Sequence, residues 1–154
     1  MDFANEDVIP FVGDLTEFSE NGPIPHGNPA IDVIFISNFL EHLSSKEEIL
    51  SLIEQVKNLL RQHGKIIILQ PNIKYVGGKY WDFFDHKTPL TDEALIELAH
   101  MLDLKVVKCV RKFLPYTTKG SLPTSAFLVR LYLLMMPVSG YVLGKQTYLV
   151  LEKK

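Results

Sequence analysis

The sequence predicts an α/β domain in which helices flank a β-sheet. Two short runs of β-branched and large apolar residues, 31–37 and 65–70, are typical of strands buried on both faces of a parallel sheet. The segment between them carries a single apolar stripe at helical spacing. Alternation of strand, helix and strand favours right-handed crossovers within one layered sheet.

The composition fits one globular domain. The chain has 154 residues, of which 47% are hydrophobic and 22% charged, so it can bury a core without disulfides. A net charge of -2 disfavours nucleic acid as a partner, because nucleic-acid binders usually carry a basic excess. The single Cys109 excludes an internal disulfide and a cysteine-rich metal site. Because residues 1–10 lack the apolar core of a signal peptide and the apolar stretch 126–138 is too short to cross a bilayer, we expect a cytoplasmic protein.

The first predicted strand spans residues 8–15 and runs into Gly13 and Asp14. Residues 19–30 are rich in Gly, Pro and Asn, which indicates a loop before the strand at 31–37. A helix follows, and Ser44 with Glu47 or Ser45 with Glu48 would form its capping box. Its apolar stripe comprises Ile49, Leu52, Ile53, Val56, Leu59 and Leu60. We expect Arg61 and His63 in its last turn, Gly64 as its stop, and a tight connection to the strand at 65–70.

The second half of the chain begins with a long irregular stretch, 71–89, that is rich in aromatic residues. Thr91 should cap the next helix, whose inner stripe comprises Leu95, Leu98, Ala99 and Leu102. A strand at 105–113, a short apolar helix near 125–136 and a last strand at 146–153 complete the predicted order. In such sheets ligands bind beyond the carboxyl ends of the strands, which here carry Asp14, residues 37–42 and residues 70–72.

The segments FVGDLTEF, IDVIFISNFLEHL and LRQHGKIIIL, in this order and spacing, resemble the later part of class I S-adenosylmethionine-dependent methyltransferases, close to types 11 and 23. The resemblance covers roughly residues 7–113, and the last strand fits the family's antiparallel hairpin. It implies strands 3 to 7 of the family's seven-stranded, Rossmann-like sheet with flanking helices. It also implies S-adenosylmethionine as the cofactor.

The sequence departs from the family at the cofactor loop. His63 replaces a usual glycine, all nine glycines lie at position 13 or later, and no two have the GxG spacing of the family's cofactor loop. The resemblance therefore implies a single, N-terminally truncated methyltransferase domain over 1–154, without the first two strands. We expect this chain alone to bind the cofactor poorly and to be weakly active or inactive. Open strand edges would favour self-association or a partner chain.

The resemblance assigns the cofactor site to two strand tips. Asp14 would accept a hydrogen bond from the adenine amino group, with the Leu15 backbone near the ring. Ser37, Asn38 and Leu40 belong to the tip that faces the methionine moiety. The alternative for Asp14 is a turn residue, and the alternative for the Ser37–Asn38 tip is a cap for the following turn.

Glu41 and His42 allow three interpretations. His42 could act as a general base toward a hydroxyl acceptor. A metal site is a second possibility, but one Glu-His pair offers too few ligands, so we expect no metal. In the third, Leu40 and Leu43 pack while Glu41 and His42 hold a loop, which we favour for Glu41.

The aromatic stretch 75–86 is expected on the acceptor side, with Gly77 and Gly78 as a hinge. Its aromatic faces and carboxylates suit a small-molecule, sugar or lipid-linked acceptor. The candidate substrate residues are Tyr75, Tyr80, Trp81, Asp82, Asp85 and Tyr116, and His86 is a second acid-base candidate beside His42. The alternative is a packed loop that closes the core. For residues 128–137 we favour a core helix over contact with a membrane surface.

The predicted function is methyl transfer from S-adenosylmethionine in the complete enzyme. The alternative is a non-catalytic methyltransferase-like subunit that acts through protein-protein pairing. Another nucleotide-binding α/β enzyme is disfavoured, because the sequence has neither a P-loop nor a GxGxxG motif.

Overall fold

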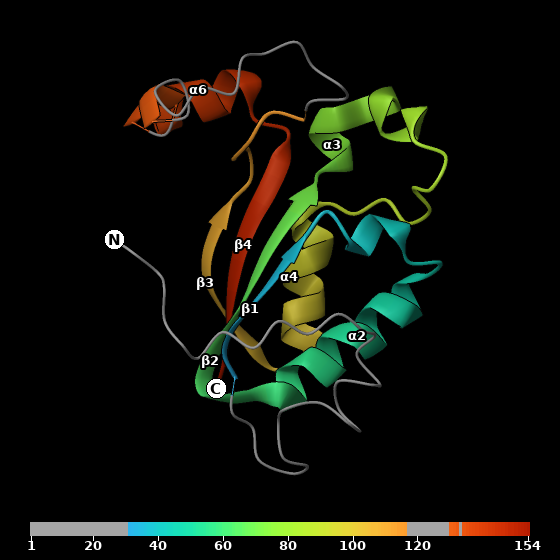
Figure 1. The fold of residues 1–154 in the computed structure, drawn as a ribbon, viewed down its shortest axis with the longest axis vertical. Coiled ribbons are helices and arrows are strands. Elements are labelled where there is room, and N and C mark those ends of the chain that lie inside the picture. Colours follow the sequence, from blue (N-terminus) through green and yellow to red (C-terminus); the bar gives the residue numbers. More distant parts are fainter. Residues whose placement is uncertain (1–30, 117–129, 133) are drawn as a thin grey trace, which may run out of the picture.

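The computed structural model describes residues 31–116, 130–132 and 134–154. The predicted strand at 8–15, with Asp14 and Leu15, therefore lies outside the described residues. Within them, a four-stranded sheet has the strand order β1-β2-β4-β3. Its strands are β1 (Ile31–Ser37), β2 (Leu60–Pro71), β3 (Leu104–Val110) and β4 (Gln146–Lys153). The predicted α/β sheet is confirmed (Figure 1).

The sheet is mixed. β1 pairs in parallel with β2, from Val33 opposite Lys65 to Ser37 opposite Leu69. β4 lies between β2 and β3 and is antiparallel to both. The antiparallel β3–β4 pair is the terminal hairpin expected from the resemblance, and β3 ends at Val110, three residues before the predicted end of that strand.

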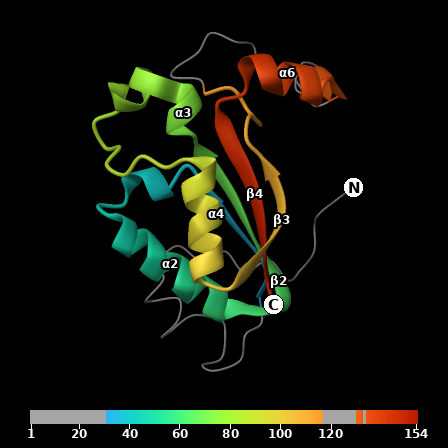
Figure 2. The same ribbon diagram turned by 180° about the vertical axis from the view of Figure 1, so that it is seen from behind.

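Helices α2 (Lys46–Leu59) and α4 (Asp92–Met101) pack on one face of the sheet (Figures 1 and 2). The apolar stripes predicted for both helices face the central strands. The buried core comprises Leu40, Ile49, Ile53, Val56, Leu60, Ile66, Ile68, Leu90, Leu95, Ala99, Leu104, Leu149 and Leu151. The predicted caps are confirmed, since the hydroxyls of Ser45 and Thr91 accept hydrogen bonds from the amides of Glu48 and Ala94.

The opposite face of β1 is open among the described residues. Val33 and Phe35 are 50% and 60% exposed, although the β-branched run of this strand predicted cover on both faces. The difference arises because α2 and α4 lie on the same face, and successive side chains of a strand point to opposite faces. In the described part of the chain, β1 is also an edge strand that pairs with β2 alone.

The helix α2 ends at Leu59, so Arg61 and His63 do not lie in its last turn as predicted but in the first part of β2. Gly64 lies in the part of β2 that passes close to the start of β1. A Cβ atom there would lie 2.9 Å from the carbonyl oxygen of Arg61 and 3.0 Å from that of Ile31, so the chain passes too close to β1 for any other residue.

Residues 71–89 are less irregular than predicted. They contain a helical turn, α3 (Ile73–Val76), and a 3-10 segment, η2 (Gly77–Asp82). The side chain of Asn72 starts α3 by accepting a hydrogen bond from the amide of Lys74. Gly77 has a φ of +62° and nothing within 4 Å of its Cβ position, so its role is conformational.

The apolar helix predicted near 125–136 differs from the structure at its end. Residues 125–129 and 133 lie outside the described part, residues 130–132 and 134 are helical as predicted, and α6 (Met136–Leu143) begins where the predicted helix was expected to stop. Pro137 lies in the first turn of α6, where its missing N–H group costs nothing. Among the described residues, no helix combines the length and apolar character needed to cross a membrane.

Candidate functional site

The tip of β1 presents two open polar side chains. Ser37 and Asn38 are exposed where β1 ends beside β2. The amide of Asn38 donates a hydrogen bond to the carbonyl of Leu69 at 2.9 Å, which fixes the turn to β2. Asn38 has a φ of +46°, in the left-handed region that Asn tolerates better than most residues. Its side-chain amide makes a long, weak contact of 3.5 Å with the Ser37 hydroxyl, so it remains available to a ligand.

The 3-10 turn η1 (Leu40–His42) directs the next residues inward. Leu40 is fully buried in the core, and so supports the tip from below instead of presenting a side chain to solvent. Glu41 is also buried, with 1% of its surface exposed. His42 is partly exposed.

The η1 turn is bound to a distant loop, residues 83–88. The carbonyl of Glu41 accepts hydrogen bonds from the amides of Lys87 and Thr88, at 2.8 and 3.1 Å. The Thr88 hydroxyl donates to the carbonyl of Leu43 at 2.6 Å. Two segments that are far apart in the sequence therefore lie side by side beyond the carboxyl end of β1 (Figure 1).

Glu41 brings a buried carboxylate to this site. Its Oε2 atom has no hydrogen-bond partner among the described residues, and neither polar atom of the Gln70 side chain has one there. Burial raises the pKa of the Glu41 carboxyl above its usual value, because it penalises the charged form. A backbone hydrogen bond, the adjacent His42 and His86, and the Gln70 amide oppose this pKa shift.

Two histidines adjoin Glu41. The ring of His86 is stacked on Phe83 with centroids 4.8 Å apart, and its Nδ1 lies 3.0 Å from the carbonyl oxygen of Tyr80. The Nδ1 of His42 lies 3.2 Å from Oδ2 of Asp85 and 3.3 Å from its carbonyl oxygen. One ligand atom each from Glu41, His42 and His86 lie within 4.8 Å of one another. The sequence had offered only the adjacent Glu-His pair, and His86 joins it only through the fold.

The residues predicted to bind substrate separate into buried and exposed groups. Tyr80 is fully buried and donates its hydroxyl to the carbonyl of Thr88 at 2.8 Å, so it holds the loop from inside. Burial is also the main cause of the raised pKa of Tyr80. Trp81, 57% exposed, packs edge-to-face on Tyr80. Asp82 and Asp85 are exposed.

Tyr75 and Tyr116 are half-buried. The ammonium group of Lys112 lies 4.9 Å from the centre of the Tyr75 ring, a cation–π contact. Tyr116 packs edge-to-face against Phe83, and burial raises the pKa of Tyr116 to about 12. Tyr116 therefore belongs with the aromatic side chains that surround His86.

A buried polar network lies at the end of β2. The side-chain amide of Asn72 donates to Asp92 at 2.8 Å and to Thr147 at 3.0 Å. The Nε of Arg111 lies 2.9 Å from the second carboxylate oxygen of Asp92, off the hydrogen-bonding direction, so this contact is an ion pair. The network joins β2, α4 and β4, which makes Asn72 a structural residue of the predicted polar edge.

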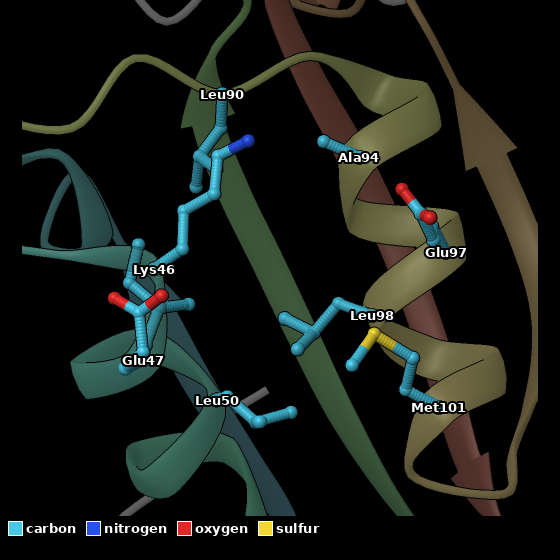
Figure 3. Close-up of a pocket in the computed structure, with 9 residues that line it drawn as sticks. Lys46, Glu47, Leu50, Leu90, Ala94, Glu97, Leu98 and Met101 are labelled. Carbon is cyan, nitrogen blue, oxygen red and sulfur yellow. The ribbon is translucent and has the colours of Figure 1, made fainter.

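A groove of about 220 Å³ lies between α2 and α4 (Figure 3). Its walls include Leu50, Leu98 and Met101, and Lys46 and Glu47 lie at its rim. No residue of the predicted site lines it. It is therefore a gap between two helices and not part of the strand-tip site.

Solved structures with the same arrangement of strands and helices identify the fold. A crystal structure of a SAM-dependent methyltransferase from Archaeoglobus fulgidus matches 92% of the chain with a TM-score of 0.60 and 22% identity. The chain has the fold of S-adenosylmethionine-dependent methyltransferases. A Haloferax volcanii structure, described as a complex between the Trm112 methyltransferase activator and a methyltransferase, matches 93% of the chain with a TM-score of 0.54 and 13% identity.

A third methyltransferase-fold structure, from Methanosarcina mazei and named SAM-dependent, matches 81% of the chain with a TM-score of 0.50 and 9% identity. The matches cover 66%, 60% and 60% of the Archaeoglobus, Haloferax and Methanosarcina chains, so the present chain spans less than two thirds of the length of each. No protein-family model matches the sequence, and a search of curated proteins finds no significant relative. The resemblance seen in the sequence is thus confirmed at the level of the fold.

Proposed function

We propose that the chain supports methyl transfer from S-adenosylmethionine to an oxygen or nitrogen of a small-molecule, sugar or lipid-linked acceptor. The observation that carries the proposal is the exposed Ser37–Asn38 tip at the carboxyl end of a parallel strand of a methyltransferase fold. Ligands of open α/β sheets bind at that end. The protein's share in such a displacement is mainly to position the two reactants.

The described residues fit the methionine end of the cofactor, which supplies the electrophilic methyl group when bound. Asn38 offers both a donor and an acceptor, and its side chain has only a 3.5 Å contact with Ser37. This pair of functions suits a zwitterion that carries an ammonium group and a carboxylate. The proposed adenine contacts of Asp14 and Leu15 lie outside the described residues.

The proposed acceptor lies against the exposed part of the aromatic segment. Trp81 and Phe84 expose large apolar surfaces beside Asp82 and Asp85. This combination suits an amphipathic or sugar-bearing acceptor. In this proposal His42 accepts the acceptor's proton when the acceptor is a hydroxyl, since its ring is partly exposed and oriented by Asp85.

Cofactor binding by the purified chain tests the proposal. Because the sequence lacks a glycine-rich loop, we expect binding of S-adenosylmethionine weaker than micromolar, detectable by saturation-transfer NMR and measured by titration. The Asn38→Gly substitution keeps the positive φ without strain and removes the amide, so it should weaken binding roughly 10-fold. Asn58→Ala, on the exposed face of α2, is the matched control. Equal binding by all three proteins would contradict the role of Asn38, and no binding by any of them would contradict the proposed function.

A second candidate function follows from the open face of β1. Val33 and Phe35 are at least half exposed on an edge strand of the described sheet, a surface that sheet proteins usually cover. The chain would then act as a non-catalytic subunit that pairs with another polypeptide. Light scattering after size-exclusion chromatography tests this candidate. A dimer that Phe35→Lys converts to a monomer would support it, and a monomer at high concentration would oppose self-pairing.

A further inference from the structure

Glu41, His42 and His86 form a cluster with the composition of a metal site. A carboxylate and two imidazoles come together from two segments, the η1 turn and the loop at 83–88. Their candidate ligand atoms lie within 4.8 Å of one another. The backbone hydrogen bonds from Lys87 and Thr88 to Glu41 hold the two segments together, so the cluster does not depend on side-chain contacts alone.

Unpartnered polar atoms point to a missing ligand in the same place. Glu41 and Gln70 are each only 1% exposed. The Oε2 of Glu41 has no hydrogen-bond partner among the described residues, and the side-chain amide of Gln70 lies near the Glu41 carboxylate without the geometry of a hydrogen bond. A buried carboxylate oxygen without a donor is costly, and native proteins usually satisfy such atoms with a hydrogen bond or an ion.

The rings of His42 and His86 pack edge to face with centroids 5.1 Å apart, and each has its Nδ1 beside an oxygen atom. The Nδ1 of His86 lies 3.0 Å from the carbonyl of Tyr80, and the Nδ1 of His42 lies 3.2 Å from the carboxylate of Asp85. A metal-binding histidine commonly donates one ring N–H to a carbonyl or a carboxylate and binds the ion through the other nitrogen. Both rings therefore have Nε2 as the nitrogen that remains for an ion.

We propose that Glu41, His42 and His86 bind a divalent transition-metal ion of the zinc type, with Asp85 as the residue that positions His42. Two imidazoles and one carboxylate form a known three-ligand set for zinc that leaves a further position for water or an oxygen of a bound molecule. The two nitrogen ligands disfavour magnesium, which prefers oxygen. Zinc–ligand distances of about 2.0–2.2 Å place tetrahedral ligands roughly 3.4 Å apart, so the side chains close inward on the ion.

Zinc binding needs neither S-adenosylmethionine nor an acceptor, so it can be tested apart from the proposed methyl transfer. The two proposals share His42, and a zinc-bound His42 has no free nitrogen with which to act as the proposed base. The test uses the full chain, stripped of metal with a chelator and titrated with Zn²⁺ alone against a chromogenic competitor. We expect one Zn²⁺ per chain, and a Co²⁺-loaded protein with the visible absorption bands of a low-coordinate site. Mg²⁺ at millimolar concentration should not displace Zn²⁺.

Substitutions distinguish the site from adventitious binding. Glu41→Gln, His42→Ala and His86→Ala should each weaken Zn²⁺ binding more than about 100-fold, and Asp85→Asn about 10-fold. His100→Ala, at the exposed end of α4, and Cys109→Ser should leave it unchanged. Because His86 is largely buried, circular dichroism must show that the His86→Ala variant folds. If it does not fold, the Zn²⁺ affinities of the His42→Ala and Glu41→Gln variants decide whether these side chains bind the ion. Failure of the native chain to bind one equivalent of Zn²⁺, or equal binding by the ligand variants, would overturn the proposal.

Discussion

The carbonyl oxygen of Glu41 lies 2.8 Å from the amide nitrogen of Lys87, and this contact joins two segments that are far apart in the sequence. It brings the turn after β1 against the loop that follows η2. Because of this contact a buried carboxylate meets two histidines beside the exposed Ser37–Asn38 tip. The strand tip and the aromatic segment thus belong to one end of the sheet.

The Thr88→Val substitution should loosen this junction. Thr88 is buried, and its hydroxyl donates to the carbonyl of Leu43 at 2.6 Å. Valine has nearly the same shape but leaves that carbonyl without its donor, so we expect the free energy of unfolding to fall by about 1–2 kcal/mol. Urea denaturation measures the change. Ser51→Ala, at an exposed position of α2, should change it little, and an unaltered Thr88→Val protein would show that the hydrogen bond does not matter.

The Glu41→Gln substitution should stabilise the metal-free protein. The carboxylate is buried, and its Oε2 has no partner among the described residues, whereas a neutral amide avoids the cost of burying a charge. We expect the free energy of unfolding at neutral pH to rise by about 1 kcal/mol. Glu54→Gln on the exposed face of α2 is the control. Destabilisation by Glu41→Gln in the presence of a chelator would argue that the carboxylate already has a favourable partner.

The Asp92→Ala substitution should destabilise the end of β2. Asp92 is 1% exposed, accepts from Asn72 and pairs with Arg111, so its loss leaves the buried Asn72 amide with Thr147 as its one remaining acceptor among the described residues. Because the Arg111 side chain is largely exposed, solvent compensates part of the loss, and we expect about 2 kcal/mol. The adjacent Glu93 forms only an exposed pair with Lys74, so Glu93→Ala should cost less than about 0.5 kcal/mol. Thermal and urea unfolding of the two variants compare a buried and an exposed carboxylate on one helix.

The reactivity of Cys109 should depend on folding and pH. Burial and then the charge of Asp92 raise the pKa of the thiol above its usual 9.0, while Arg111 opposes the shift. The native thiol therefore keeps its proton to higher pH than the unfolded thiol, and iodoacetamide should react more slowly with the native chain at pH 8. Since the folded state binds more protons in the window above pH 9.0, this group lowers stability as pH rises there. Equal alkylation rates for the native chain in buffer and the unfolded chain in urea would contradict the raised pKa of the Cys109 thiol.

The sequence by itself determined the elements and the fold. The stripe from Ile49 to Leu60 and the caps at Ser45 and Thr91 fixed the helices, because helical periodicity and capping depend on residues three or four apart. The run at 146–153 predicted β4 with its bounds. The polar residues after the 31–37 strand located the exposed tip, since a buried strand must end where polar side chains can reach solvent.

Only the tertiary structure decided which of those residues meet and which face the interior. Periodicity could not predict that α2 stops at Leu59, because Leu60 continues the apolar stripe of the helix although it already belongs to β2. It could not separate the buried Tyr80 from the exposed Trp81, which are neighbours in an irregular segment. Nor could it place His86 beside Glu41 and His42, because hydrogen bonds between distant segments bring them together. Local patterns determine local structure, whereas a site assembled from two loops exists only once the chain has packed.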